Sequence, residues 1–408
     1  MTITFSEQQK TAIDLAMKYN ISILSGGPGV GKSVVTKGIV EAYLAKNPFD
    51  SIYLCAPTGR AAKRLEEVTG DKGKTIHRLL GYRPMMGFER NGNNPLPGPG
   101  LLIADEMSMT DLPLAHSLFA AIPEDVKVVL VGDADQLPSV GPGNVLRDLI
   151  ASGRIPVTRL DYVYRQAEGS GIAYLAEHIR QGALPKNWRD LEDVEVITVE
   201  DRAAIAGIVV EKYKEAAERF GGVGSVLALA PMYEGSDGVK ALNEALRATM
   251  NPAEEGKQEQ AIGGKLWRID DKVMVVKNNY DLEVFNGDVG LIVGFSIKPP
   301  RGIHVQIAGG GRVSFNEEDG DTEHLVLAYA CTVHRGQGGE APAVIMVMSI
   351  GHKFFAQRNL IYTGITRAKK RLILVGQEDA IRYAVKKNDI AGRNTRLAEL
   401  IRGKEGVK

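Results

Sequence analysis

The octapeptide GGPGVGKS, at residues 26–33, constrains this chain more than any other stretch. It satisfies the pattern G-x-x-x-x-G-K-[ST], with an apolar strand-like run before it and a helical run after it. In that setting glycines let backbone N–H groups close around phosphate oxygens, and a lysine and a hydroxyl complete the site. A glycine-rich turn without a ligand is the alternative, and the flanking elements argue against it. The stretch therefore predicts a nucleotide site built from Gly27, Gly29, Gly31, Lys32 and Ser33.

Continuous apolar runs recur along the chain and predict parallel strands covered on both faces. In the first part they lie at residues 21–24, 51–55, 101–106 and 127–133. A second series lies at residues 226–232, 324–331, 344–348 and 371–376. Because helical stretches separate them, we expect two doubly wound α/β domains, at residues 1–165 and 166–408.

Two segments interrupt this alternation of strands and helices. Residues 265–320 contain short strand-like runs with glycine-rich turns, which predict a small antiparallel β-barrel inserted in the second domain. Residues 82–100 contain four glycines and four prolines and predict a non-helical insertion in the first domain. Its Asn-Gly and Asn-Asn pairs at 91–94 suit the turn of a hairpin flanked by Met85, Met86 and Phe88. A flexible surface loop fits the same residues equally well.

The composition is that of a globular protein without strong charge preference. The 50 basic residues balance the 50 acidic ones, so any nucleic-acid contact would come from local patches. No run approaches the length of a membrane span, and the first ten residues lack a secretory signal. The two cysteines, Cys55 and Cys331, lie in apolar runs and predict buried, reduced thiols. We expect a cytoplasmic protein that does not associate with membranes.

Acidic residues follow two of the predicted strands. Asp105 could hold the shell of a Mg²⁺ ion, and Glu106 could polarise the water that attacks a phosphate. A helix N-terminus favoured by acids is the alternative. After the next strand comes Asp133, and beyond it Gln136 could sense the γ-phosphate or merely stabilise its turn. These residues make ATP hydrolysis with Mg²⁺ the expected chemistry.

Hydrolysis of ATP also needs positive charge on the transferring phosphoryl group. Arg165, in LDYVYRQ, and Arg367, in TGITRAKKRL, are the candidates, although each alone is more often a surface arginine. The stretch YACTVHRGQGGEAPAV, at residues 329–344, predicts two strands joined by a polar loop. Its loop, from Thr332 to Glu340, is rich in groups that could bind ligands.

Taken in order, these blocks resemble the motifs of superfamily 1B helicases, the RecD-like and Dda-like branch. FSEQQKTA resembles the adenine-reading Q motif, GGPGVGKS motif I, APTGRAAKRL motif Ia and KTIHRLLGY motif Ib. IADEMSM is similar to motif II, LVGDADQLPSVGPG to motif III and LDYVYRQ to motif IV. CTVHRGQGGE is similar to motif V and NLIYTGITRAKKRLILVG to motif VI. The resemblance spans residues 5–376.

The resemblance implies two RecA-like domains with ATP between them, and single-stranded DNA across their top. It implies 5′-to-3′ movement, a hairpin at 82–100 that splits strands, and an SH3-like barrel at 265–320. The implied catalytic residues are Lys32, Glu106, Gln136, Arg165 and Arg367, with Ser33 and Asp105 at Mg²⁺. Beyond the P-loop, the implied ATP contacts are Gln9, Gly338 and Glu340. The implied nucleic-acid contacts are Pro57, Thr58, Arg60, Thr75, His77, Thr332 and His334.

Three functions are compatible with these residues. A DNA helicase leads, acting on single strands and on junctions of single- and double-stranded DNA, as a monomer that works with replication or recombination proteins. A translocase that strips proteins without efficient unwinding is the second, and a non-catalytic DNA-binding loading factor is the third. The residues alone do not separate DNA from RNA. The sequence departs from the family at Arg335 and Gly336, where Lys-Ser or Lys-Ala is usual. Because the given sequence begins at the Q motif, we expect a compact Dda-type enzyme without the extra N-terminal domain of longer relatives.

Overall fold

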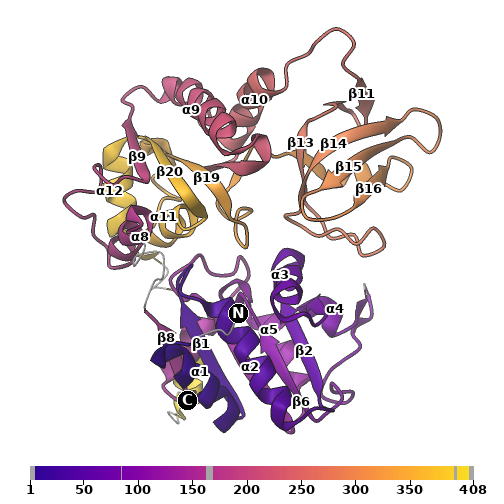
Figure 1. Ribbon diagram of the computed structural model, residues 1–408, viewed down its shortest axis with the longest axis vertical. Coiled ribbons are helices and arrows are strands. Elements are labelled where there is room, and N and C mark those ends of the chain that lie inside the picture. The colour runs from indigo at the N-terminus through magenta and orange to yellow at the C-terminus, as the bar shows by residue number, and fades with distance from the viewer. Residues whose placement is uncertain (1–4, 84, 162–168, 390–392, 404–408) are drawn as a thin grey trace. The chain divides into compact units, whose positions relative to one another are not determined.

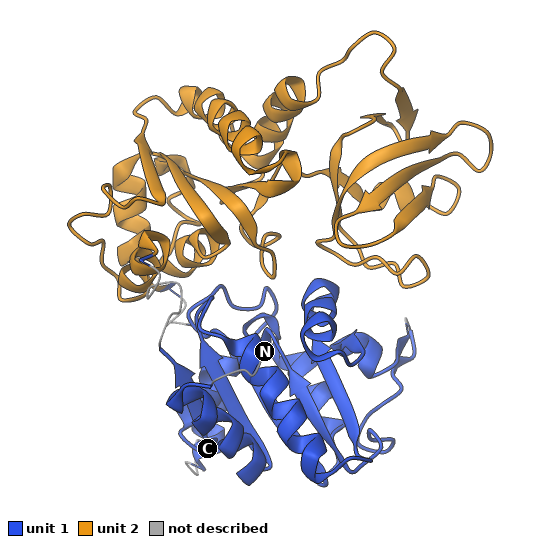
Figure 2. Ribbon diagram, viewed as in Figure 1, with its two compact units in different colours: residues 1–169, 389–408 blue, residues 170–388 orange. Residues whose placement is uncertain are grey.

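The computed structural model describes residues 5–83, 85–161, 169–389 and 393–403, which form two compact units (Figures 1 and 2). Unit 1 comprises residues 1–169 and 389–408, and unit 2 comprises residues 170–388. This division differs from the predicted one at the C-terminus, because the last segment returns to unit 1. There Leu397 and Ile401 of α13 (Leu397–Arg402) pack against the apolar core of unit 1, and burial of these side chains favours that position.

A six-stranded parallel sheet forms the centre of unit 1, in the order β3-β2-β6-β7-β1-β8 (Figure 1). All five residues of β6 are buried, which is typical of a parallel strand covered on both faces. The strands are β1 (Ile21–Gly26), β2 (Ser51–Ala56), β3 (Gly73–Thr75), β6 (Gly100–Ala104), β7 (Val126–Gly132) and β8 (Val157–Leu160).

Helices cover both faces of this sheet. Helices α1 (Glu7–Lys18), α2 (Lys32–Lys46) and α3 (Gly59–Thr69) share one apolar cluster with one face. On the other face lie α4 (Ile76–Leu79), α5 (Leu112–Ala120), α6 (Val145–Ser152) and α13. The predicted doubly wound α/β class is thus confirmed for this unit, and the parallel strands place their carboxyl ends at one edge.

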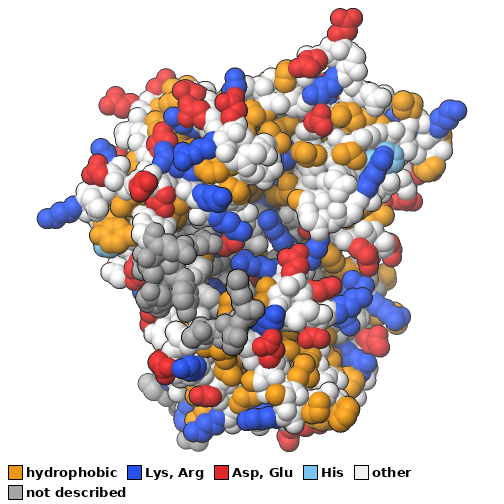
Figure 3. Space-filling view, viewed as in Figure 1, with side chains coloured by type: hydrophobic (Ala, Val, Ile, Leu, Met, Phe, Trp, Pro, Cys, Tyr) orange, Lys and Arg blue, Asp and Glu red, His pale blue; other side chains and the backbone are white. Residues whose placement is uncertain are grey.

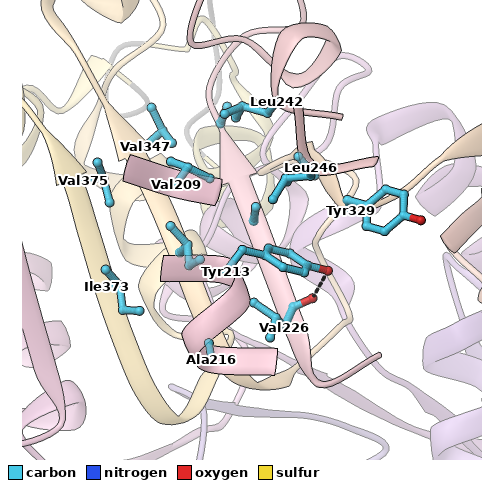
Figure 4. Close-up of a cluster of buried hydrophobic side chains, with 14 of the residues drawn as sticks. Val209, Tyr213, Ala216, Val226, Leu242, Leu246, Tyr329, Val347, Ile373 and Val375 are labelled. Carbon is cyan, nitrogen blue, oxygen red and sulfur yellow. Dashed lines mark hydrogen bonds between the residues drawn. The ribbon is translucent and has the colours of Figure 1, made fainter. Parts of the chain in front are cut away.

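Unit 2 has a second parallel sheet, in the order β18-β10-β19-β20-β9. Figure 4 shows its core, in which Tyr213 of α9 (Ile205–Phe220) donates a hydrogen bond of 3.3 Å to the carbonyl of Val226. Helix α10 (Val239–Met250) packs beside α9, whereas α8 (Gly171–Arg180), α11 (Arg358–Ile365) and α12 (Glu378–Lys386) lie on the other side of the sheet (Figure 1). The strands are β9 (Val194–Thr198), β10 (Val226–Ala230), β18 (Ala330–Thr332), β19 (Ala341–Met348) and β20 (Ala368–Gly376).

The apolar run at 324–331 is not one strand, as predicted, but two. Strand β17 (Leu325–Leu327) pairs antiparallel with β13 (Lys272–Val275), whereas β18 pairs parallel with β10. The chain therefore leaves one sheet and enters the next within three residues. Local apolarity could not show this division, because the run is apolar on both sides of the break.

The predicted barrel is present as a five-stranded antiparallel sheet, β16-β15-β14-β13-β17, with a hairpin of β11 and β12 beside it. These strands extend from 259 to 327, slightly beyond the predicted limits. Trp267, Ile292, Val305 and Phe315 form part of its core. Its remaining strands are β11 (Glu259–Ile262), β12 (Lys265–Arg268), β14 (Val289–Ser296), β15 (Gly302–Ile307) and β16 (Arg312–Asn316).

The insertion at 82–100 contains a short hairpin, but its turn is not where the Asn-Gly pair predicts. Strands β4 (Tyr82–Arg83) and β5 (Gly87–Phe88) pair antiparallel, and the described part of the turn between them is Met85 and Met86. Met85 adopts a left-handed backbone with φ of 67°. The Asn-Gly pair instead sits in a separate small loop closed by a bridge between Asn91 and Asn94.

A buried ionic cluster ties three loops together at the carboxyl edge of the second sheet. The Arg202 Nε donates to Asp237 Oδ1 at 2.7 Å, and His352 Nε2 lies 3.5 Å from Asp237 Oδ2. Burial alone would raise the pKa of Asp237, but the neighbouring His352, Arg202 and Ser349 outweigh it and hold that pKa well below its usual range. The ionised carboxylate therefore stabilises the folded unit.

We expect Asp237→Asn to lower the free energy of unfolding by about 3 kcal/mol at pH 7, since it leaves Arg202 without its buried partner charge. The folded pKa is depressed, so the contribution is complete above the unfolded pKa of about 4 and declines as the pH falls towards the folded value. Urea unfolding at pH 7 and pH 3 should show a gap between variant and parent that narrows at pH 3. The exposed Glu234 of the same loop provides the control, Glu234→Gln. A gap independent of pH would contradict this account.

Candidate functional site

The glycine-rich loop joins β1 to α2 and forms an anion-binding site at the carboxyl edge of the first sheet. Gly29 and Gly31 have φ of 78° and 89°, a left-handed conformation that side chains disfavour. The N-cap residue of α2 is Gly31, which has no side chain to cap the helix, and the N–H groups at the start of such a helix can bind phosphate. Lys32 Nζ donates to the carbonyls of Gly26 and Gly27, at 2.6 and 2.9 Å. The loop thus holds its lysine close to its own backbone, at the start of a helix.

The acidic pair predicted for catalysis follows β6 at the same edge. The Asp105 N–H donates to the carbonyl of Cys55 on β2 at 2.9 Å. Burial, with the neighbouring Glu106 charge, raises the pKa of Asp105 to about 6, although Lys32 and Arg64 act to lower it. A nearby cation stabilises the ionised form of such a buried carboxylate. The loop follows β1 and Asp105 follows β6 of the same parallel sheet, so both lie at its carboxyl edge.

Glu106 stands at a strained position in the backbone. Its φ of 52° and ψ of 38° are left-handed, and it caps the short helix Met107–Met109. Such a conformation costs a non-glycine residue about 1 kcal/mol or more and is concentrated at functional sites. This backbone conformation sets the direction of the Glu106 side chain. No pattern in the sequence indicated the left-handed conformation.

Gln136 lies near the end of β7, where it is held by a neighbouring acid. Its Nε2 donates to Asp133 Oδ2 at 3.3 Å, and its N–H donates to the Asp133 carbonyl at the same distance. The turn-stabilising interpretation therefore has a direct structural basis. A role at the γ-phosphate remains a prediction.

Gln9 also has a structural function in the described chain. Its Oε1 accepts the Ser6 N–H at 3.0 Å while Ser6 Oγ accepts the Gln9 N–H at 3.3 Å, which together form a capping box at α1. The side chain is only 3% exposed. Recognition of adenine would have to use the Nε2 group or replace the cap, so the predicted adenine contact stays a prediction. The pattern S-x-x-Q in the sequence could have indicated the cap.

In unit 2 the structure brings together the predicted ligand-binding loop and Arg367. The Arg367 guanidinium is 3% exposed and donates to the carbonyls of Thr363 and Gly339, at 3.0 and 3.3 Å. Glu340 Oε2 lies 3.2 Å from Lys369 Nζ, and Gly338 has φ of 70°. Arg367 thus joins the loop at 333–340 to the end of α11. The other candidate arginine, Arg165, lies outside the described residues.

Several of the predicted nucleic-acid contacts serve as helix caps. The Thr58 Oγ1 accepts the Ala61 N–H at 3.3 Å, and the Thr75 Oγ1 accepts the Arg78 N–H at 3.1 Å. Thr75 is buried, whereas Pro57 and Arg60 are partly exposed beside Thr58 at the end of β2. Both threonines follow the strand ends of β2 and β3, so they mark one part of the carboxyl edge. Their contact with nucleic acid stays a prediction.

His77, Thr332 and His334 have different surroundings. His77 packs against the rings of Tyr82 and Phe88, with centroids 5.5 and 5.7 Å away, and burial lowers its pKa despite the charge of Asp111. Thr332 Oγ1 accepts the Arg335 N–H at 3.3 Å, and His334 is exposed. The ring cluster links His77 to the base of the hairpin, which the sequence did not show.

Charged side chains of both signs lie on the face of the molecule that Figure 3 shows. Within the described chain no helix is long and apolar enough to cross a membrane. Both cysteines are buried thiols outside any disulfide, as predicted.

Comparison with protein families matches three parts of the chain. Residues 9–142 match an AAA domain, residues 242–306 the ATP-dependent RecD-like DNA helicase SH3 domain, and residues 327–375 the UvrD-like helicase C-terminal domain. The match at 242–306 covers much of the barrel and confirms its SH3-like character. The match at residues 9–142 contains all strands of the first parallel sheet except β8. The match at residues 327–375 contains β18, β19 and nearly all of β20 of the second sheet.

Two relatives align with nearly all of this chain. The ATP-dependent RecD2 DNA helicase of Deinococcus radiodurans is 38% identical over 398 residues, which are 97% of this chain. The chain spans about half of that protein, 52% of its length. RecBCD enzyme subunit RecD of Mycobacterium tuberculosis is 31% identical over 428 residues, covering 96% of this chain and 72% of that protein.

Solved structures of Pif1 helicases have the same fold. Pif1 from Bacteroides in complex with ADP-AlF3 and ssDNA superposes with a TM-score of 0.59 at 16% identity, over 96% of each chain. Bacteroides Pif1 bound to ssDNA gives a TM-score of 0.56 at 18% identity, over 91% of this chain and 92% of that one. At such identities the likeness concerns the fold, and it supports two RecA-like α/β domains with an SH3-like insertion.

Proposed function

This chain belongs to the RecD-like branch of the superfamily 1B helicases, and on that premise we propose that it is an ATP-dependent DNA helicase. It would move 5′ to 3′ on single-stranded DNA and separate the duplex ahead. The observation that carries the proposal is the intact site of unit 1, where the glycine-rich loop with Lys32 follows β1 and the pair Asp105 and Glu106 follows β6 of the same parallel sheet. A protein that no longer hydrolysed ATP would not need a phosphate-binding loop, a glutamate in a strained backbone conformation and a buried aspartate at one site.

In the proposed reaction each residue of unit 1 has a separate task. The backbone of the loop and the first turn of α2 bind the phosphates, and Lys32 exchanges its carbonyl partners for phosphate oxygens. Glu106 orients the attacking water and accepts its proton. We propose that Arg367 of unit 2 adds positive charge to the transferring phosphoryl group. It would do so by exchanging its backbone partners for phosphate, which couples hydrolysis to the 333–340 loop.

A Mg²⁺ ion fits the donor atoms of this site. Ser33 provides a hydroxyl and Asp105 a carboxylate, the hard oxygen ligands that Mg²⁺ prefers. Among the described residues no group of three His, Cys, Asp or Glu side chains could hold a metal without other ligands. An ion bound here would therefore need phosphate oxygens as well, as is usual for ATP-dependent enzymes. When bound, it would neutralise charge that develops on the phosphates.

The test is a pair of measurements on the whole chain. ATP hydrolysis should be slow without nucleic acid, strongly stimulated by single-stranded DNA and weakly by RNA, and it should require Mg²⁺. Unwinding should occur on duplex with a 5′ tail and not on duplex with a 3′ tail. Stimulated hydrolysis without unwinding would instead favour a translocase that displaces proteins. DNA binding without ATP hydrolysis would instead favour a non-catalytic DNA-binding loading factor.

A further inference from the structure

Strand β18 stands at one end of the second sheet, and a side chain of α10 binds the backbone on its outer side. On the inner side the Ala228 N–H of β10 donates to the Tyr329 carbonyl at 3.4 Å. On the outer side the Ala330 N–H donates to Asn243 Oδ1 at 3.0 Å, and Asn243 Nδ2 donates to the Ala330 carbonyl at 2.9 Å. A carboxamide carries the same donor and acceptor as a peptide unit. Asn243 therefore takes the place of a neighbouring strand at this edge.

Helix α10 holds the Asn243 side chain in this position. Asn243 is 6% exposed, and its Nδ2 also donates to the Val239 carbonyl at 3.0 Å, one turn earlier in the helix. Leu242 and Leu246 of the same helix point into the apolar core of unit 2 (Figure 4). The amide thus uses both of its N–H groups and its oxygen, on a helix that the core fixes in place.

Ala330 stands two positions before Thr332, where the predicted ligand-binding loop begins. Strand β18 has only three residues, so it makes few hydrogen bonds with β10, and the contact with Asn243 is a large part of what holds it. Directly after β18, Val333 is fully buried and His334 is exposed. The position of β18 therefore sets the direction in which Thr332 and His334 leave the sheet.

The far end of the same loop has a separate anchor. Arg367 Nη1 donates to the Gly339 carbonyl at 3.3 Å, and the Ala341 N–H donates to the Arg367 carbonyl at 3.0 Å. Loss of the Asn243 side chain would therefore release the start of the loop, which carries the predicted DNA contacts. The end of the loop, which carries the predicted ATP contacts, would stay anchored by Arg367.

We propose that Asn243 is a positioning residue for DNA binding, which fixes β18 so that Thr332 and His334 are presented to the nucleic acid. The inference rests on the proposed function, in which these two residues contact DNA. A loop that is already ordered loses less conformational entropy when it binds a ligand than one that must become ordered. The affinity for DNA should therefore depend on Asn243, although its buried side chain is not itself a DNA contact.

A purely structural role is the alternative, since the backbone of a buried edge strand needs hydrogen-bond partners. Asn251, directly after α10, represents that role. It is 2% exposed, and its Nδ2 donates to the Ile269 carbonyl at 3.0 Å and to Asp271 Oδ1 at 2.9 Å. Both of these contacts are to the barrel segment at 269–271. If Asn243 served only to satisfy buried backbone, loss of either asparagine would have the same effect.

The experiment compares Asn243→Ala, Asn243→Gln and Asn251→Ala in the full chain, at a temperature at which circular dichroism shows each to be folded. It measures the concentration of single-stranded DNA that gives half-maximal stimulation of ATP hydrolysis, and the rate at saturating DNA. We expect Asn243→Ala to raise this concentration about tenfold, which corresponds to about 1.4 kcal/mol. The saturated rate and the KM for ATP should change by less than about twofold. Asn243→Gln keeps the amide on a longer side chain and should give a smaller rise, and Asn251→Ala should keep the parental value.

A parental half-stimulating concentration in Asn243→Ala, or an equal rise in Asn251→Ala, would overturn the proposal. A lower saturated rate without that rise would also overturn it, because general destabilisation has this effect. Hydrogen exchange without ATP or DNA provides a readout independent of activity. Exchange in the peptide at 329–336 should rise in Asn243→Ala and stay parental in Asn251→Ala. If DNA does not stimulate hydrolysis by the parent, the proposed function fails, while this exchange comparison still decides whether Asn243 holds the start of the loop.

Discussion

Glu106→Gln should lower the rate of ATP hydrolysis by about 10²- to 10⁴-fold, because an amide cannot accept the proton of the attacking water. ATP binding should stay close to that of the parent, since the phosphates are bound by the loop, Lys32 and α2. Glutamine has the shape of glutamate and leaves the strained backbone of this residue unchanged. Single-turnover hydrolysis and binding of a fluorescent nucleotide would separate the two effects.

The matched control for Glu106→Gln is Glu124→Gln. Glu124 is an exposed carboxylate just before β7, so it lies at the opposite edge of the sheet from the site. Its replacement removes the same charge and should leave turnover unchanged. Near-normal turnover in Glu106→Gln would exclude this residue as the base and would transfer that role to another acid of the site.

The parts of the structure that sequence predicted are those that local chemistry determines. The glycine-rich loop could be predicted because its turns need a left-handed backbone at Gly29 and Gly31, a conformation that few other residues accept. The strands before Lys32 and Asp105 were readable because parallel strands buried on both faces are continuously apolar. Since the loop and Asp105 each follow a parallel strand, the sequence also predicts that they meet at the carboxyl edge of one sheet.

The parts that sequence missed depend on contacts between distant residues. Nothing near Arg393 in the sequence indicates that it binds carbonyls about 250 residues earlier, at Ser139 and Gly143. The hairpin turn was misplaced because the Asn-Gly signal is strong by itself, while Met85 adopts a left-handed φ that its own preference disfavours. In both cases tertiary packing, and not local preference, decided the outcome. Gln9 differs, because its capping box with Ser6 is a local contact that the pattern S-x-x-Q could have indicated.

Replacement of the hairpin tip should reduce DNA unwinding about tenfold or more while DNA-stimulated ATP hydrolysis stays within about twofold. Met85 is fully exposed and Met86 is 79% exposed, so both side chains extend from the turn into solvent. The base of the hairpin is held by Tyr82 and Phe88, whose ring centroids lie 5.1 Å apart. An apolar tip on a fixed base can press between base pairs. Since one stacking step is worth about 1.4 kcal/mol, its loss changes a rate about tenfold.

The structure also determines which variant tests this tip. Leu96 is buried and its N–H donates to the Ala121 carbonyl at 2.8 Å, so deletion of the whole insertion would disturb the core of unit 1. The double variant Met85→Gly with Met86→Ser removes only the exposed side chains, and glycine suits the left-handed φ at the first position. Phe49→Ser is the control, because Phe49 is an equally exposed hydrophobic residue outside the insertion. Strand separation of a duplex with a 5′ tail, followed by fluorescence, measures the effect beside the ATPase rate. Unwinding at the parental rate by the double variant would show that this hairpin is a surface loop without a part in strand separation, because the tip side chains are the groups of the hairpin best exposed to a base pair.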